Sequence, residues 1–195
     1  IINSIIVSKR DKKRPLWYDL WSEKIDYLEL QISEFGKKYP TLRKSFPYFC
    51  GLAETAIQLL EIVDVKEYTI NHKYITKDER LEDFLNPINM VIDLKTRDIA
   101  EYLKTNYNHI TSIDDLKYII KKFNLNKEEI KLLFVRTLFP NYYFNSFEEI
   151  IAGEKDESYI NQYIDDASKK EYLLKIFYSF VKSITDFPTI DYLER

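Results

Sequence analysis

The stretch that carries the most chemically useful residues is LNPINMVIDLKTRDIAEYLK, from Leu85 to Lys104. An apolar run ends there at Asp93, and Arg97 and Asp98 follow four and five residues later. A carboxylate at the end of a buried strand is a common position for metal-binding and catalytic residues. Spacing alone favours a plainer interpretation, in which Asp93 belongs to a turn and Asp98 to the first turn of a helix, where the helix dipole favours a carboxylate. Arg97 could pair with either acid.

The remaining candidates for chemistry are Cys50, the single cysteine, and the two histidines, His72 and His109. One cysteine and two distant histidines cannot form a zinc site at standard spacing. A nucleophilic pair of Cys50 with His72 is conceivable, but Cys50 falls on the apolar face of a predicted helix, where cysteine is usually a small hydrophobe. Glu54, in the same helix, could be buried and paired or could lie on the solvated face.

The composition of the 195 residues bounds the class of protein. With 45% hydrophobic and 31% charged residues, the chain is typical of a soluble globular protein. The net charge of -3 argues against nucleic acid as a partner. No apolar run approaches the ~20 residues that span a membrane, and a single cysteine indicates a reducing, cytoplasmic setting. The three glycines do not cluster, so no glycine-rich phosphate loop is present in this sequence.

Most of the chain has a helical pattern. Apolar residues at three and four spacing predict one helix from Pro15 to Gly36 and a second from near Ser45, with Pro47 in its first turn, to Val63. Capping residues predict the starts of the later helices: Thr96 before Arg97–Tyr107, Ser112 with Asp115, Asn126 with Glu129 before Ile130–Phe139, Ser146 with Glu149 before a short helix ending near Gly153, and Ser158 at the start of a long helix to Ile184.

Two short segments have a strand pattern instead. Glu67–Ile75 alternates and is rich in β-branched and aromatic residues, and Ile88–Leu94 is a short apolar run after Pro87. We expect the two to pair as a small antiparallel ribbon around the loop Thr76–Pro87. No repeat, low-complexity tract or linker interrupts the chain, so we expect residues 1–195 to form one mainly α-helical domain.

Several of these segments resemble the C-terminal half of the aminoglycoside phosphotransferase and choline kinase-like superfamily, and above all its spore-coat-associated members. The similar segments are FPYFCGLAETAIQLLE (Phe46–Glu61), NHKYI (Asn71–Ile75), VIDL (Val91–Leu94), RDIAEYLK and LLFVRTLFPNYYF (Leu132–Phe144). The resemblance implies the protein-kinase-like fold, in which a β-rich N-terminal lobe grips the nucleotide and a helical lobe carries the catalytic loop and metal ligands. The chain is similar to the helical lobe alone, and we expect it to be part of a longer protein.

The resemblance also implies roles for single residues. Asp93 falls on the Mg-binding position and Asp98, beside Arg97, on the structural brace of the catalytic loop. His72 falls on the first residue of the family's His-Gly-Asp loop, but Lys73 and Tyr74 stand where Gly and Asp are expected. The Asp of that loop orients and deprotonates the acceptor hydroxyl, which a tyrosine cannot do at neutral pH.

Two further parts of the family's site have no match in this chain. No asparagine lies at the spacing of the second metal ligand, although Asn86 and Asn89 are near. The lysine of the β-rich lobe that pairs with the nucleotide phosphates has no counterpart here.

These residues leave three hypotheses. The first, which we favour, is a degenerate kinase-like protein, possessing the helical lobe as a scaffold or protein-interaction module associated with the spore coat. The second is an active small-molecule phosphotransferase that uses Mg and ATP, with a displaced base at Asp78 or Asp83. The third is an unrelated helical interaction domain that resembles the family by accident. The absence of the Asp expected at position 74 and of the glycine loop favours the first.

Overall fold

The computed structural model describes residues 16–65, 67–72 and 86–194. It is mainly helical with one two-stranded antiparallel sheet, as the sequence predicts. Over its described residues the chain divides into two compact units, each built from two separate stretches of sequence. We call residues 16–62 with 138–168 the helical unit, and residues 63–137 with 169–194 the ribbon unit. The expectation that residues 1–195 form one domain stays a prediction. No helix in the described ranges is long and apolar enough to cross a membrane.

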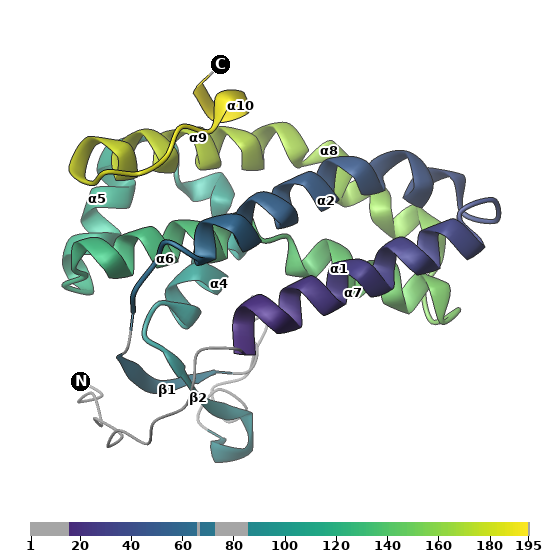
Figure 1. The fold of residues 1–195 in the computed structure, drawn as a ribbon, viewed down its shortest axis with the longest axis horizontal. Coiled ribbons are helices and arrows are strands. Elements are labelled where there is room, and N and C mark those ends of the chain that lie inside the picture. Colours follow the sequence, from purple (N-terminus) through teal and green to yellow (C-terminus); the bar gives the residue numbers. More distant parts are fainter. Residues whose placement is uncertain (1–15, 66, 73–85, 195) are drawn as a thin grey trace. The chain divides into compact units, whose positions relative to one another are not determined.

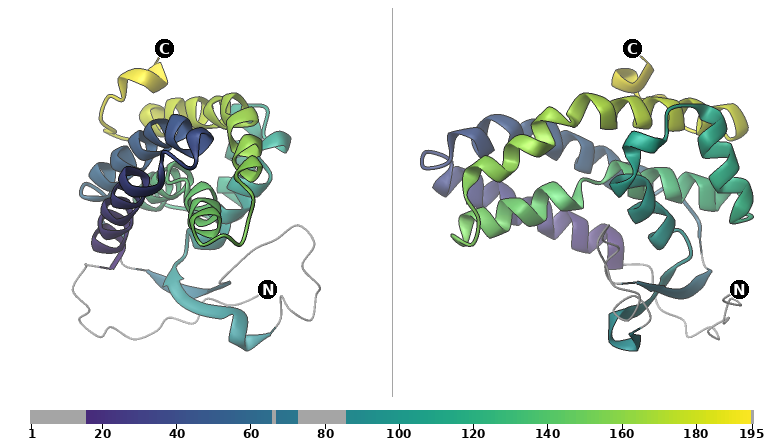
Figure 2. Two further views of the ribbon diagram at one scale, coloured as in Figure 1. Left: turned by 90° about the vertical axis from the view of Figure 1, so that its right-hand side faces the viewer. Right: turned by 180° about the vertical axis from the view of Figure 1, so that it is seen from behind.

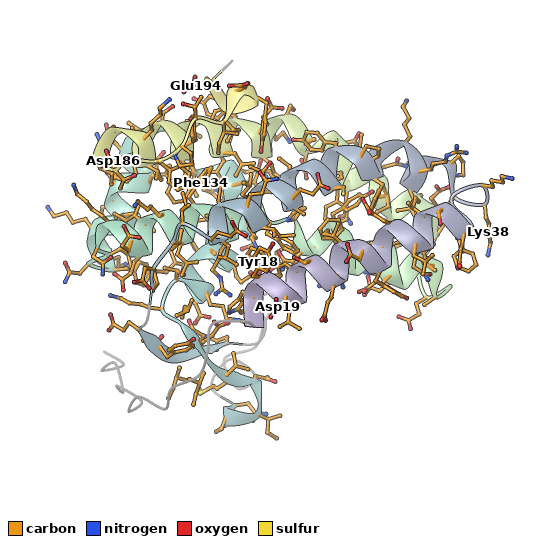
Figure 3. The ribbon with its side chains drawn as sticks, viewed as in Figure 1. Tyr18, Asp19, Lys38, Phe134, Asp186 and Glu194 are labelled. Atoms are coloured by element: carbon orange, nitrogen blue, oxygen red, sulfur yellow. The ribbon has the colours of Figure 1, made fainter. Side chains whose placement is uncertain are left out.

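The helical unit is built around a pair of long helices. Its described elements are α1 (Leu16–Phe35), α2 (Pro40–Leu60), α7 (Asn141–Ile151), a 3-10 helix (Glu157–Ile160) and α8 (Asn161–Asp165). Helices α1 and α2 run side by side in opposite directions (Figure 1). Figure 3 places Lys38 in the turn between them and Tyr18 and Asp19 at the far end of α1. The predicted first helix is confirmed over its described residues.

Aromatic stacking holds the two sequence stretches of the helical unit together. The rings of Trp21 and Phe139 stack at 4.0 Å between centroids, and those of Phe49 and Tyr143 stack at 3.8 Å. Both pairs join a residue of the first helix pair to one more than ninety positions later. Ring pairs of this kind contribute about 0.5–1.5 kcal/mol beyond the area they bury.

Helix α2 begins earlier than the sequence pattern predicts. Pro40 is its first residue, so Pro47 lies inside the helix and not in its first turn. Ser45, near which the helix is expected to begin, lies inside it, and its hydroxyl donates to the carbonyl oxygen of Thr41 at 2.9 Å and contacts the Tyr143 hydroxyl at 2.8 Å. A serine that bonds back to the preceding turn is compatible with a helix interior.

A glutamate from the other sequence stretch caps α2. Tyr39, at the N-cap position, supplies no side-chain hydrogen bond, and Pro40 has no N–H to donate. The Oε1 atom of Glu157 accepts hydrogen bonds from the backbone N–H groups of Thr41 at 2.6 Å and Leu42 at 3.0 Å. Its negative charge also lies at the positive end of the helix dipole.

The ribbon unit contains both strands. Strands β1 (Tyr68–His72) and β2 (Met90–Leu94) pair antiparallel, with Tyr68 opposite Leu94 and His72 opposite Met90. This confirms the predicted ribbon, although a 3-10 helix (Pro87–Asn89) replaces the expected start of the second strand. Residues 73–85, which hold most of the predicted loop, lie outside the described residues.

Helices make up the rest of the ribbon unit. They are α4 (Arg97–Thr105), a 3-10 helix (Tyr107–His109), α5 (Ile113–Lys122), most of α6 (Lys127–Leu138), most of α9 (Ala167–Ile184) and α10 (Asp191–Glu194). Figure 2 shows the two-stranded sheet from two further sides, and α4 is the next element of the chain after strand β2. Phe134 on α6 is fully buried and meets Phe177 and Phe187 edge-on, each at 5.4 Å between centroids. Figure 3 labels Phe134 among the side chains beside α6.

The predicted helix starts at Ser112, Asn126 and Thr96 are confirmed, and the one at Ser146 is wrong. Ser112 with Asp115, and Asn126 with Glu129, form reciprocal capping boxes. Thr96 precedes α4 as predicted but makes no capping hydrogen bond, because its backbone is already helical. Ser146 does not start a helix: α7 begins at Asn141, directly after Pro140, and Ser146 is buried within it.

The predicted long helix from Ser158 to Ile184 is divided. A 3-10 helix covers Glu157–Ile160, a short α8 comes next, and α9 starts only at Ala167, after a break at Asp166. The apolar spacing continues through this break, so periodicity alone does not detect it.

We predict that Glu157→Ala lowers the free energy of unfolding by about 1–2 kcal/mol, because it removes the acceptor for two N–H groups at the start of α2. Urea unfolding followed by far-ultraviolet circular dichroism measures the effect. Glu154→Ala, at an exposed position nearby, is the matched control. Equal effects of the two substitutions would show that the cap contributes nothing.

Candidate functional site

Asp93 lies at the end of β2 and is buried, with 4% of its surface exposed. Its Oδ1 accepts the backbone N–H of Leu94 at 2.6 Å and the Nη1 of Arg136 at 3.3 Å. Its Oδ2 accepts Nη1 of Arg97 at 2.6 Å and Nη2 of Arg136 at 3.3 Å. We call Asp93, Arg97 and Arg136 the Asp93 hub. Both carboxylate oxygens are therefore engaged by guanidinium groups.

Sequence reasoning missed Arg136, which comes from α6. It is separated from Asp93 by 43 residues. A signal was present, because Arg136 interrupts the apolar run LLFVRTLF, all eight residues of which are buried. A charged residue inside such a run almost always has a partner, because burying an unpaired charge costs several kcal/mol. The run predicts a buried ion pair but does not identify the acid.

Burial shapes the electrostatics around the hub. It lowers the pKa of Arg136 below its usual value, an effect that Asp93 partly opposes. Burial also lowers the pKa of Lys104, whose ammonium lies 3.3 Å from Glu101 and whose pKa is lowered further by Arg136 and Arg97. Lys104 therefore lies close enough to Arg97 and Arg136 to be affected by their charges.

Two consecutive residues at the start of α4 hold His72 at the end of β1. The Oδ1 of Asp98 accepts the backbone N–H of His72 at 2.9 Å, and its Oδ2 lies 2.6 Å from Nδ1 of the ring. The Nε of Arg97 donates to the backbone carbonyl oxygen of His72 at 3.0 Å. We call this arrangement the His72 clamp. It fixes the backbone and the ring of His72 at the point where the chain leaves the ribbon.

The structure brings together four of the predicted site residues: His72, Asp93, Arg97 and Asp98. Arg97 belongs to both the hub and the clamp, since it donates to Asp93 and to His72. The predicted bases Asp78 and Asp83 lie outside the described residues, as do Lys73 and Tyr74. Asn86 accepts the N–H of Ile88 at 3.1 Å and so caps the 3-10 helix before β2. A metal-ligand role for Asn86 or Asn89 stays a prediction.

The donor set at Asp93 does not fit the magnesium ion that the resemblance implies. Mg²⁺ binds oxygen ligands at 2.0–2.1 Å in near-octahedral geometry and keeps several waters. Both oxygens of Asp93 already accept N–H groups, and each oxygen contacts at least one guanidinium group. Two unit charges 4 Å apart repel by about 4 kcal/mol at an effective dielectric constant of about 20, and a dication doubles this for each arginine.

Cys50 lies in α2, within the helical unit, and is buried. Its sulfur contacts Oε1 of Glu29 at 3.7 Å, and Glu54 is one helical turn further along. The ligand atoms of these three side chains lie within 4.8 Å of one another. Burial, together with the charges of Glu54 and Glu29, raises the pKa of Cys50 to about 12. The thiol is therefore protonated at neutral pH, which is the opposite of what a cysteine nucleophile requires.

Comparisons with known proteins point to the bacterial spore coat. The family model described as "Spore coat putative kinase YutH" matches residues 6–177. The endospore coat-associated protein YutH of Bacillus subtilis (strain 168) is 27% identical over 177 residues, which cover 76% of this chain and 50% of that protein. The chain thus spans about half the length of this curated relative. No solved structure matches.

We predict that Asp93→Asn destabilises the fold by about 3–5 kcal/mol, because it removes the carboxylate that both terminal nitrogens of the buried Arg136 guanidinium contact. Urea unfolding measures the change. Replacing both charges in Asp93→Leu/Arg136→Met should recover much of the loss, since apolar groups of similar volume need no partner.

Asp114→Asn is the control for this series. The side chain of Asp114 is 84% exposed and pairs with Lys117, so removing its charge should change the free energy of unfolding by no more than about 0.5 kcal/mol. A cost for Asp93→Asn as small as that of the control would contradict a buried ionic hub.

We predict that Cys50 reacts slowly with iodoacetamide in the native protein at pH 8. A pKa raised from 9.0 to about 12 lowers the thiolate fraction about a thousandfold. Glu54→Gln should speed the reaction by removing a negative charge, whereas Glu34→Gln on α1 should not. Because the native thiol is neutral, the raised pKa contributes stability that is complete below about pH 9 and is lost as the pH rises toward 12. A native rate equal to that in urea would contradict the assignment.

Proposed function

Because the family model matches most of its length, the chain belongs to the YutH family of spore-coat proteins, and we propose that it is a non-catalytic, kinase-like scaffold of the coat. In this proposal the described residues are the helical lobe of a protein-kinase-like fold. The lobe serves as a protein-interaction module, and the site inherited from phosphotransfer chemistry has become structural.

The observation that carries the proposal is the His72 clamp, together with the identity of the two residues after His72. Asp98 and Arg97 hold the backbone of His72 by its N–H and its carbonyl oxygen. In a kinase-like site such a brace positions the catalytic loop, so the residues directly after His72 would perform the chemistry. Those residues are Lys73 and Tyr74. In this proposal the brace is still present, but the sequence has a tyrosine at the position where the family's loop has its catalytic aspartate.

The Asp93 hub supports the same proposal independently. A metal-binding carboxylate must present at least one oxygen to the ion, but both oxygens of Asp93 accept N–H groups from arginines. The acid at the metal position is therefore used to balance buried charge.

The alternative is an active small-molecule phosphotransferase that uses Mg and ATP. The retention of Asp93 and Asp98 and the words "putative kinase" in the family description favour it. It requires a base from elsewhere, such as Asp78 or Asp83, and a nucleotide-binding lobe outside this chain. It also requires Asp93 to exchange its arginines for a metal ion when nucleotide binds.

An unrelated helical interaction domain is the third candidate. That hypothesis would gain support from a structure without an antiparallel ribbon between helical segments. The ribbon of β1 and β2 is present, with helices before and after it in the chain. We therefore favour the kinase-like scaffold, with association to the spore coat and protein partners as parts of the proposal.

We predict that the full-length protein gives no saturable heat when Mg·ATP is titrated into it up to millimolar concentration, because both oxygens of Asp93 accept N–H groups from arginines and are not open to the metal ion. Isothermal titration calorimetry makes the measurement, with folding checked by circular dichroism. Saturable binding that Asp93→Ala abolishes and Asp114→Ala preserves would contradict the scaffold and support the phosphotransferase.

A further inference from the structure

Arg136 and Arg97 approach Asp93 in different ways. Arg136 reaches both carboxylate oxygens, with Nη1 and Nη2 each at 3.3 Å, whereas Arg97 makes a single end-on contact with Oδ2 at 2.6 Å. The side chain of Arg136 is 5% exposed and that of Arg97 is 22% exposed. Arg97 is therefore the more exposed of the two and also donates to the carbonyl oxygen of His72, whereas Arg136 is enclosed and cannot leave Asp93 without a rearrangement of α6 and its neighbours.

We propose that the guanidinium of Arg136 is the permanent counter-cation of Asp93. It takes the place that a divalent metal would have in a kinase-like site, so the hub excludes divalent cations. The inference goes beyond the scaffold proposal, because it assigns the exclusion to one residue of α6 and predicts that its removal opens the site.

The geometry explains why an arginine can replace the ion. A planar guanidinium matches the two oxygens of a carboxylate and is always charged, so it satisfies Asp93 without waters or further ligands. A magnesium ion would need several more oxygen ligands. The neighbouring arginines offer N–H groups instead, since Arg97 and Arg136 both donate to Asp93.

The same contact accounts for the position of Arg136 in an otherwise apolar stretch of α6. Leu133, Phe134 and Val135 directly before it are fully buried. An arginine there would be strongly unfavourable without a carboxylate, and Asp93 in the same place would be equally unfavourable without a cation. The charge of each residue compensates the buried charge of the other, so the pair needs no ligand from solution.

Mn²⁺ alone, without nucleotide, is the probe for a test on the full-length protein. Free Mn²⁺ is measured by its electron paramagnetic resonance signal during titration. Wild type and Asp93→Asn should give the same titration curve. Arg136→Met should bind Mn²⁺ at least about tenfold more tightly than wild type, and Arg136→Met/Asp93→Asn should lose this gain. Lys131→Met, on the same helix but paired with Glu128, is the control and should change nothing.

Two outcomes would overturn the inference. The first is Mn²⁺ binding by wild type that Asp93→Asn removes, and the second is a folded Arg136→Met that gains no binding. If Arg136→Met fails to fold, the comparison of wild type with Asp93→Asn still decides the first point, and Arg136→Lys provides a second variant that retains charge but cannot bridge both oxygens. Asp93-dependent Mn²⁺ binding without any binding of ATP would overturn this inference and leave the scaffold proposal standing.

Discussion

The ribbon unit depends on the neutralisation of one buried carboxylate. Burying a carboxylate is costly unless it has partners, and Asp93 obtains them from the start of α4 and from the middle of α6. Arg97 then extends the same network to the carbonyl oxygen of His72, and Asp98 secures the N–H of that residue. The ends of both strands are thus fixed to helices by charge-assisted hydrogen bonds. A two-stranded ribbon is only marginally stable by itself, so these bonds are an important part of what keeps it in place.

Local sequence signals were enough to predict the elements that have local causes. The ribbon, the first helix and the capping boxes at Ser112 and Asn126 follow from alternation, periodicity and side chains within four residues of one another. The start of α2 was missed because its cap comes from Glu157, more than a hundred residues away. The break at Asp166 was missed because the apolar spacing runs through it.

The candidate site likewise contains residues that local sequence signals identify and one residue that only the folded chain brings to it. His72, Asp93, Arg97 and Asp98 could be found from the sequence because they lie in two short strands and the helix after them. Arg136 could not be assigned to Asp93, because only the folded chain brings α6 to the end of β2. That one missing residue changes the chemistry most, since it turns a carboxylate that resembles a metal ligand into one half of an ion pair.

The division of the chain into interleaved units has a consequence for its synthesis. The ribbon unit begins at residue 63 and is interrupted by residues 138–168, which complete the helical unit. The α1–α2 pair therefore emerges from the ribosome long before the aromatic rings of α7 and the carboxylate of Glu157 that complete its packing and its cap. Neither unit can be finished when its first stretch has been made, and each must close over a long intervening segment. The packing of α1 and α2 should thus be completed only after residues 141–157 have been translated, because these residues supply the stacked ring of Tyr143 and the cap of α2.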